Sequence, residues 1–594
     1  MTRASFLVSW LLIVGSNQII GQTAVPSRVG RLSYVEGSGS FQPAGVEEWV
    51  PPVINRPVTP GDQLWVDRDS KAEIEIGTAV FRLSQKTAFS FLNLDDSVVH
   101  IRLPQGTLEA HIEQLGDGEQ LDIDTPSTSL SLLDPGEYRI EVNEGGDATI
   151  FTVRSGRGRG ASGDFTFAVR APQAAHISGL DSVSYSLSEV PPRDEFDEWC
   201  FKRDHRDNDQ NAGALSQEVV GRQDLDPKGW RIDPEYGAAW TPPDVSQDWA
   251  PYRDGQWNWI DPWGWTWVDN APWGFAPFHY GRWIFVNGAW EWVPGPATIP
   301  GVYAPALVAW VGAGVSGVAW VPLAPGERYA PAYQASAVYL NRVNATVNGV
   351  GRGGNRPIYL NLRFVTAVPR GVFVGSMPVW HAATRVPPVT QNRLTFSVQT
   401  KVAPERVSVL GHANGSQGFV RPPNVVLTRT VVARIVPPLA PVPFSVQKPL
   451  LARVAGRPLD SVTLSRLRAE RKLGVNPFIR VIPSTIGPVN MPRIGRSPDG
   501  RQPAVSPIPT SLPTKSDALS RNDPTIASKP MTDEVREREK LSLNSHSQRP
   551  TGRNYKPQGG QVGKPHPQKS HQPTRGQSSA KPEHPATGKT SPKK

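Results

Sequence analysis

Residues 283–293 read Trp-Ile-Phe-Val-Asn-Gly-Ala-Trp-Glu-Trp-Val, two alternating runs separated by an Asn-Gly pair. Asn-Gly is favoured in the two-residue turn of a β-hairpin, because both turn positions adopt positive φ. A hairpin with this turn pairs Phe285 with Trp290 and Trp283 with Trp292, so four aromatic rings share one face. Such cross-strand aromatic pairs contribute about 0.5–1.5 kcal/mol beyond the area they bury. The segment therefore predicts a hairpin with an aromatic core.

The surrounding sequence repeats this device. Fifteen of the 19 tryptophans lie between residues 199 and 320. Residues 252–257 contain Asp-Gly and predict a second hairpin, in which Tyr252 opposes Trp257. Residues 261–264 (Asp-Pro-Trp-Gly) and 271–274 (Ala-Pro-Trp-Gly) suit type I turns ten residues apart. We expect a Trp-rich domain of tandem β-hairpins over residues 213–330.

The aromatic face of this domain has two interpretations. Indole rings at every second residue usually form a core, but a large exposed aromatic surface binds sugar rings or cations. His279, Tyr280 and Arg282 could form a polar site beside it, or could hydrogen-bond the backbone around a core. As a ligand-binding face, the candidate residues are Trp257, Trp259, Trp263, Trp265, Trp273, His279, Tyr280, Arg282, Trp283, Trp290 and Trp292.

Residues 26–170 read as a ladder of short strands. Residues 121–124 and 138–142 alternate apolar and charged side chains, which places the two kinds on opposite faces of a strand. Breakers such as Pro60-Gly61-Asp62 and Leu103-Pro104-Gln105-Gly106 recur every 8–14 residues. This spacing predicts an antiparallel β-sandwich or rolled β structure.

Two families resemble these regions. The N-terminal ladder resembles the FecR-type domain at Val29-Gly30, Glu36-Gly37, Pro60-Gly61-Asp62, Asp124-Thr125-Pro126, residues 134–139 and residues 153–156. The resemblance implies an extracytoplasmic β module, best known for relaying a ligand signal to a sigma factor. The Trp-rich region resembles a Trp/Gly/Pro-rich domain of unknown function that often follows FecR-like modules in exported bacterial proteins. The residues that carry this second resemblance lie at 248–252, 255–259, 273–283, 290–295 and 318–327.

The N-terminus and the connector have their own signals. Arg3 and the apolar run 6–14 predict a secretory signal peptide over residues 1–24, and hence a periplasmic or cell-surface protein. Residues 191–212 form a connector that contains a helix from Arg193 to Asp209. Cys200 lies on the apolar stripe of that helix, so we expect it to be buried.

The second half is basic and rich in proline. The net charge is −19 over residues 1–300, +18 over 301–500 and +10 over 501–594. Residues 331–450 alternate over 363–374, 394–402 and 424–436 but are broken by Pro-Pro pairs, which predicts a β region that is extended, edge-like or weakly folded. Residues 451–594 are expected to be a basic, largely disordered tail, with a short helix over 459–473. Such a tail attracts anionic polymers.

No catalytic, metal-binding or cofactor-binding motif stands out, so we expect a non-enzymatic protein without a cofactor. The leading hypothesis is an exported, envelope-associated interaction or scaffold protein that binds cell-wall or envelope polysaccharide, or another anionic polymer. Export disfavours nucleic acid as a partner. The alternative is a periplasmic sensory module that relays ligand binding to a membrane protein, and an unrecognised hydrolase is the third option.

Overall fold

The computed structural model describes residues 24–163, 165–205, 213–313, 316–345, 359–387, 391, 394–412 and 420–482. These residues all fall within one compact unit. Strand outweighs helix, 36% against 16%, which confirms the expected mainly β class. No helix in these ranges has both the length and the apolar character needed to cross a bilayer. The predicted signal peptide (apart from Ala24) and the tail beyond residue 482 lie outside the described residues.

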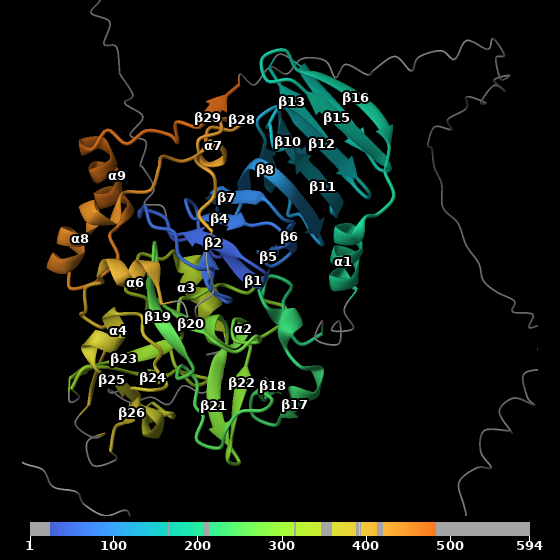
Figure 1. Cartoon of the computed structure of the whole chain (residues 1–594). Helices are drawn as coiled ribbons and strands as arrows, with labels where there is room; N and C mark the ends of the chain where they lie inside the picture. Colours follow the sequence, from blue (N-terminus) through green and yellow to red (C-terminus); the bar gives the residue numbers. More distant parts are fainter. Residues whose placement is uncertain are drawn as a thin grey trace, which may run out of the picture. The chain divides into compact units, whose positions relative to one another are not determined.

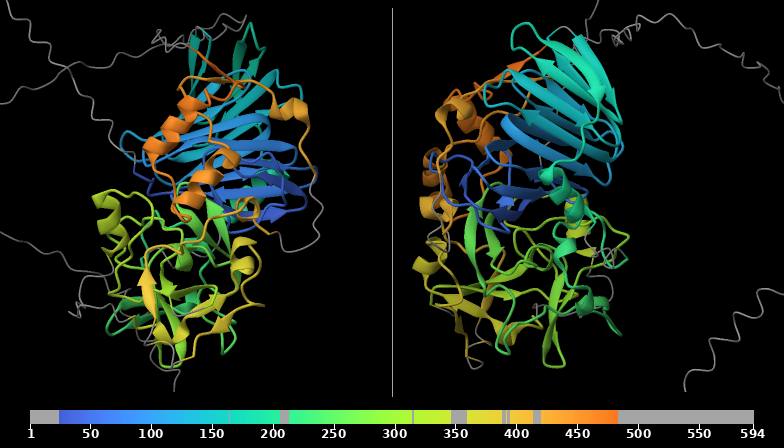
Figure 2. Two further views of the ribbon diagram at one scale, coloured as in Figure 1. Left: turned by 90° about the vertical axis from the view of Figure 1, so that its left-hand side faces the viewer. Right: turned by 45° about the vertical axis from the view of Figure 1, so that its right-hand side comes forward.

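Residues 30–189 form a two-layer β module, blue to teal in Figures 1 and 2. The first layer runs β3-β1-β5-β6-β8-β11-β12-β15-β16 and the second β2-β4-β7-β8-β9-β10-β13-β14, so that β8 belongs to both. All pairs are antiparallel except β8 with β9, which corrects the purely antiparallel expectation. The strands are β1 Gly30–Glu36, β2 Gly39–Gln42, β3 Pro57–Val58, β4 Gln63–Val66, β5 Lys71–Glu75, β6 Ala79–Leu83, β7 Thr87–Leu94, β8 Val98–Ile112, β9 Gln120–Asp124, β10 Ser129–Leu132, β11 Gly136–Val142, β12 Ala148–Val153, β13 Arg157–Ser162, β14 Phe165–Arg170, β15 Gln173–Ser178 and β16 Ser184–Glu189.

The corner between the two layers lies inside β8. Residues 103–106, predicted as a breaker, do not end a strand but form a bulge within this 15-residue strand. Ala88 pairs with Gln105 while Ser90 pairs with Arg102, so Leu103 and Pro104 have no partners in β7. Gly106 has a φ of +101°, a conformation that residues with a Cβ atom rarely adopt. The strand therefore passes from one layer to the other without a turn.

Helix α1 (Glu195–Asp204) covers the outer face of the first layer. Asp194 caps it through a reciprocal hydrogen-bond pair with Asp197, so the helix begins two residues later than predicted. Its C-cap is His205, and residues 206–209 of the predicted helix lie outside the described residues. Buried ion pairs hold it down, among them Arg203 with Glu73 and Asp204 with Arg82. Cys200 is fully buried, as expected. The charged side chains on the outer face of β5 and β6 are thus buried, as are the apolar side chains on the inner face of the same strands.

The Trp-rich region forms a second core. Its elements are η2 Arg222–Asp224, η3 Pro227–Gly229, β17 Trp230–Asp233, β18 Gly237–Trp240, β19 Gly255–Ile260, β20 Gly264–Asp269, α2 Ala276–His279, β21 Arg282–Val286, β22 Ala289–Val293, β23 Val308–Ala313 and β24 Val318–Pro322. The β21–β22 hairpin has the predicted register, with Phe285 opposite Trp290 and Trp283 opposite Trp292. The hairpin predicted at Asp254-Gly255 is wrong, because Gly255 begins β19 and pairs with Asp269 of β20. The longer β19–β20 hairpin instead pairs Trp257 with Trp267 and Trp259 with Trp265.

The second half contains more helix than predicted. Its elements are α3 Ala337–Val343, η5 Leu362–Phe364, β25 Thr366–Val368, α4 Arg370–Val374, β26 Thr384–Arg385, β27 Thr395–Ser397, α6 Arg406–Leu410, α7 Asn424–Leu427, β28 Val431–Ala433, α8 Phe444–Arg453, α9 Ser461–Glu470 and β29 Ile479–Val481. Pro369, Pro423 and Pro443 are the N-cap residues of α4, α7 and α8. Proline is tolerated at a helix start, where its missing N–H is not needed, so these prolines begin helices rather than interrupt strands. Residues 370–374 and 424–427, predicted as strand, are therefore helical.

The second half also completes the Trp-rich core. Phe373, Val402, Phe444 and Leu451 are buried in the same cluster as the indoles, so this core extends beyond the expected boundary at residue 330. Helix α9 confirms the short helix expected within 459–473. Order continues to residue 482 rather than fading at 451, because α8 and β29 pack on earlier parts of the chain.

The β8 corner gives a test of the fold. A Cβ atom at Gly106 would lie 2.4 Å from the Thr87 Cα, whereas one at Gly118, also at positive φ (+77°), would meet nothing within 4 Å. We expect Gly106→Ala to lower the free energy of unfolding by about 3 kcal/mol or more and Gly118→Ala by about 1 kcal/mol, since only the first adds a backbone clash to strain. Urea unfolding followed by circular dichroism measures both. Equal losses would contradict the proposed corner.

Candidate functional site

The predicted aromatic face is the interior of the Trp-rich core. Ten of the eleven candidate side chains expose 7% or less of their surface, and Trp273 is half-buried against the same cluster. Trp257 lies near its middle, with ring centroids of Tyr252, Trp267, Trp310, Trp320 and Phe373 at 4.6–6.5 Å. Of the two interpretations the structure therefore favours the core, and these residues do not form an open platform.

Many of the indole N–H groups are bonded within this core. Trp265 donates to the Val402 carbonyl at 2.9 Å and Trp292 to the Tyr280 carbonyl at 2.8 Å. Trp267 donates to the Asp269 carboxylate at 2.9 Å. Each bond satisfies a buried donor and fixes the orientation of a ring.

His279, Tyr280 and Arg282 do not converge on one polar site. His279 donates from Nδ1 to the Ala304 carbonyl at 2.8 Å and lies between the rings of Phe275 and Tyr303. Burial lowers the pKa of His279 to about 3, so its ring is neutral near pH 7. The hydrogen-bonding alternative for these residues matches what the structure shows.

Arg282 fastens the core to later segments. Its Nε donates to the Glu327 carbonyl at 3.1 Å, and its Nη2 donates to the Asn344 side chain at 3.0 Å. Burial lowers the pKa of this guanidinium to about 10. A charge held by carbonyl and amide oxygens of the described residues, rather than by a carboxylate, suits a structural role more than a ligand site.

Sequence reasoning missed a chain of tyrosines beside this core. Tyr329, Tyr333 and Tyr339 link their hydroxyls at 3.3 and 2.6 Å, and Tyr339 donates to the Tyr303 carbonyl at 2.6 Å. These tyrosines are buried, and burial raises the pKa of each hydroxyl. Only their spacing in residues 329–339 could have drawn attention to them, because what they contact is distant in sequence.

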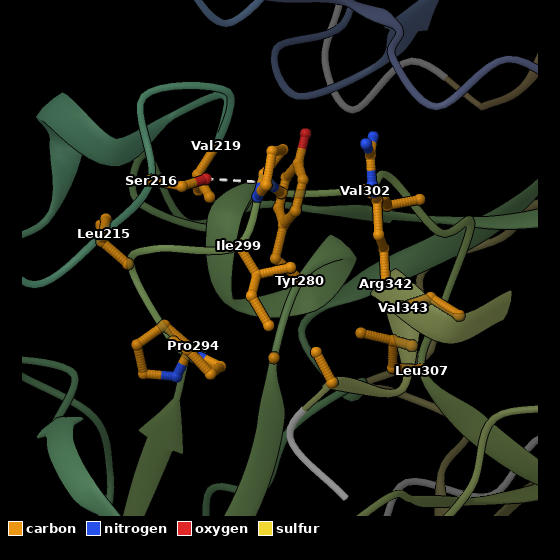
Figure 3. Close-up of a pocket in the computed structure, with 16 residues that line it drawn as sticks. Leu215, Ser216, Val219, Tyr280, Pro294, Ile299, Val302, Leu307, Arg342 and Val343 are labelled. Carbon is orange, nitrogen blue, oxygen red and sulfur yellow. Dashed lines mark hydrogen bonds between the residues drawn. The ribbon is translucent and has the colours of Figure 1, made fainter. Parts of the chain in front are cut away.

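Two small cavities border the aromatic core. The first, about 40 Å³, lies between Ser216, Tyr280 and Arg342 (Figure 3), where Ser216 accepts from the Gly301 N–H at 2.8 Å. The second, about 30 Å³, is lined by Trp263, Trp265, Tyr329 and Tyr333 among others. Such volumes hold two or three waters, whereas ligand pockets usually measure about 300–1,000 Å³.

The strongest exposed feature is charge on α8, α9 and the adjoining turns. Residues 421–482 hold 11 Lys+Arg against two acidic residues. We use the term basic surface for its exposed cations around the two helices, which lie on the same side in Figures 1 and 2. They are Lys448, Arg453, Arg457, Arg466, Arg471 and Lys472.

The fold and site together define a mainly β protein with a tryptophan core and a basic exposed face. Residues 222–327 match the model of a family of unknown function, DUF6600. This match covers the Trp-rich region, in agreement with the second resemblance drawn from the sequence, and assigns no activity. The resemblance of residues 26–170 to the FecR-type domain stays a prediction.

Comparison with solved structures gave two crystal structures, at 1.65 and 2.50 Å resolution, of a protein described as an anti-sigma factor from Parabacteroides distasonis ATCC 8503. Each has 8% sequence identity and a TM-score of 0.20, over 22% of this chain and 59% of that one. The chain thus spans less than two thirds of their length, and the likeness is too low to carry an argument. A comparison with curated proteins found no match.

The buried histidine gives a test by pH. Its folded pKa of about 3 lies below the ordinary value of about 6.5, so the unfolded chain binds the proton first as the pH falls. The stability contributed by the neutral ring is present above about pH 6.5 and lost below it. His279→Asn keeps a donor near the Nδ1 position but does not titrate.

Between pH 7 and pH 5 we expect the wild type to lose about 2 kcal/mol more of its free energy of unfolding than His279→Asn. Urea titrations of both proteins at each pH measure this difference. The contributions of the other titrating groups are the same in both proteins and cancel. Parallel pH profiles would show that His279 is not buried as described.

Proposed function

We propose that this protein is a non-enzymatic, exported scaffold of the cell envelope, which holds an anionic polymer through its basic surface. The observation that carries the proposal is the disposition of charge. Carboxylates of the acidic first half are engaged by arginines of the same half, as in Arg31 with Asp224 and Glu75, and Arg139 with Asp197. The cations of the basic surface are exposed instead, although Lys448 pairs with Glu405 and Arg466 with Glu470 at the surface.

The charged surface explains polymer binding better than aromatic stacking does. A sugar ring stacks only on an indole it can reach, and the candidate indoles are buried. Clustered cations attract an acidic chain without a pocket, since the attraction acts over about 10 Å at 0.1 M salt.

Charge reversal on α9 tests the proposal. In the full chain, Arg466→Glu, Arg471→Glu and Lys472→Glu together change the net charge by −6 on the basic surface. Retention on a column of immobilised polyuronic acid, with elution by NaCl, is the measurement, and a neutral dextran column is the polymer control. We expect the wild type to elute at several-fold higher NaCl than this variant, because the variant displaces fewer counterions from the polymer.

A matched variant separates local from total charge. Arg170→Glu, Lys202→Glu and Lys228→Glu make the same −6 change at exposed cations outside the basic surface. This control should elute near the wild type. If the two variants elute together, or if the wild type passes through the polyuronic acid column unretained, the basic surface does not hold the polymer.

A further inference from the structure

Residues 420–433, which we call the strap, cross the outer face of the second layer of the β module. The strap contains α7 and β28, and β28 contacts β8, β9 and β10. The Val432 N–H donates to the Thr125 carbonyl at 2.9 Å. Figures 1 and 2 show this orange segment lying against the blue strands. A segment from late in the sequence thus occupies a face built entirely by early residues.

The strap is not part of the core of the β module. That core consists of buried residues between Leu32 and Ile177. The strap is anchored in two small separate clusters instead. In one, Val426 packs against Trp49, Trp65 and Ala88, and in the other Val432 packs against Ala161 and Ile482. The module therefore closes its own core without the strap.

The β module binds the strap chiefly through the strap's main chain. Arg102, only 4% exposed, donates from Nη2 to the carbonyls of Leu427 at 3.0 Å and Arg429 at 2.6 Å. Ser40 donates from its hydroxyl to the Val420 carbonyl at 2.9 Å. Main-chain hydrogen bonds combined with a side-chain pocket are how protein surfaces bind extended peptides. Here the Val426 cage is the pocket.

Arg429 of the strap makes the reciprocal contacts. Its Nη1 donates to the Pro104 carbonyl at 3.0 Å and its Nη2 to the Glu144 carbonyl at 2.7 Å. Both acceptors belong to the module, at the β8 corner and in the turn that follows β11. The bulge that shapes the module therefore also supplies part of the face on which the strap lies.

Charges of both signs meet at this contact. Burial, and then the neighbouring Arg429, lower the pKa of Arg102 to about 10, whereas Asp147 of the module acts on the pKa of Arg429 in the opposite direction. Each guanidinium is held by main-chain carbonyls, Arg102 by those of the strap and Arg429 by those of the module. Hydrogen bonds to the main chain, rather than a pair of opposite charges, therefore hold the strap on this face.

We propose that the outer face of the second layer is a binding site for an extended peptide, filled here by the chain's own strap and able to take the strap of a second copy. The second copy is the occupant that the structure favours, because its strap has the sequence already seen to fit the Val426 cage and Arg102. Exchange of an identical segment between copies adds little new cost when β29, which pairs with β28, moves with the strap, since every contact is then remade.

A synthetic peptide of residues 420–434, labelled for fluorescence anisotropy, tests the site. In the full chain, Val426→Asp with Arg429→Ala removes the strap's main anchors and leaves the face unchanged. We expect the peptide to bind this strap variant at least tenfold more tightly than the wild type. Arg102→Ala added to the strap variant, or Val426→Asp placed in the peptide, should weaken binding at least tenfold. Equal affinity for the wild type and the strap variant would overturn the site.

Complementation tests the occupant. A full chain with Arg102→Ala has an intact strap and an impaired face. The strap variant has an impaired strap and an intact face. Light scattering should show a heterodimer in their mixture and monomers, or the same smaller species, in each alone. A mixture that matches the separate proteins would overturn exchange between copies.

The strap variant could lose its near-UV circular dichroism signal and with it its tertiary packing. In that case hydrogen exchange on the wild type tests the same site. An excess of peptide should displace the strap, so exchange at the amide of Val432, which donates to the Thr125 carbonyl, should rise severalfold, while β9 amides of the core stay unchanged. Unchanged exchange at saturating peptide would overturn the proposal.

Discussion

Twelve indole rings pack into one core, and the short hairpins that carry most of them cannot enclose a core of this size. Trp265 shows the consequence, because its N–H is satisfied by the carbonyl of Val402, 137 residues later, and its ring lies 4.2 Å from that of Phe373. Apolar cover stabilises a buried indole, and an acceptor for its N–H stabilises it further. The second half of the chain supplies such cover, so the described residues beyond 330 pack on this core despite their prolines.

Arginine is the second organising element, and it acts in two ways. On the first layer, guanidinium groups meet carboxylates, as in Arg82 with Glu73. Elsewhere buried arginines meet main-chain carbonyls, as Arg56 does at Val409 at 2.8 Å and Arg102 at Leu427. A guanidinium carries five donors, so it can bridge several carbonyls of distant segments. These bridges connect the early β module to the late segments.

Features that depend on residues close in sequence, such as a turn type or the register of a hairpin, could be predicted from the sequence. The Asn-Gly turn and alternating aromatics predicted the β21–β22 register pair by pair, and residues 138–142 lie in β11 as expected. The predictions were wrong where contacts with residues distant in sequence determine strand continuity or burial. Leu103–Gly106 resembles a turn, but β6, β9 and β11 pair with β8 on both sides of it and keep the strand continuous. Asp122 and Asp124 alternate like a solvent-facing edge, yet both are buried because residues late in the chain cover them. For the same reason the indole pattern alone could not separate a core from a binding face.

The basic surface and the strap belong to the same late segment, and this links the two proposals. A surface of exposed cations holds a polyanion weakly, because each contact is screened by salt. Strap exchange would join copies of the chain and present several basic surfaces to one polymer, so that detachment would require all of them to release together. Because α8 packs into the tryptophan core, each basic surface would remain fixed to a rigid body when its strap moves to another copy. The tryptophan core, which is covered by the second half of the chain, thus also anchors the segment from which the strap extends.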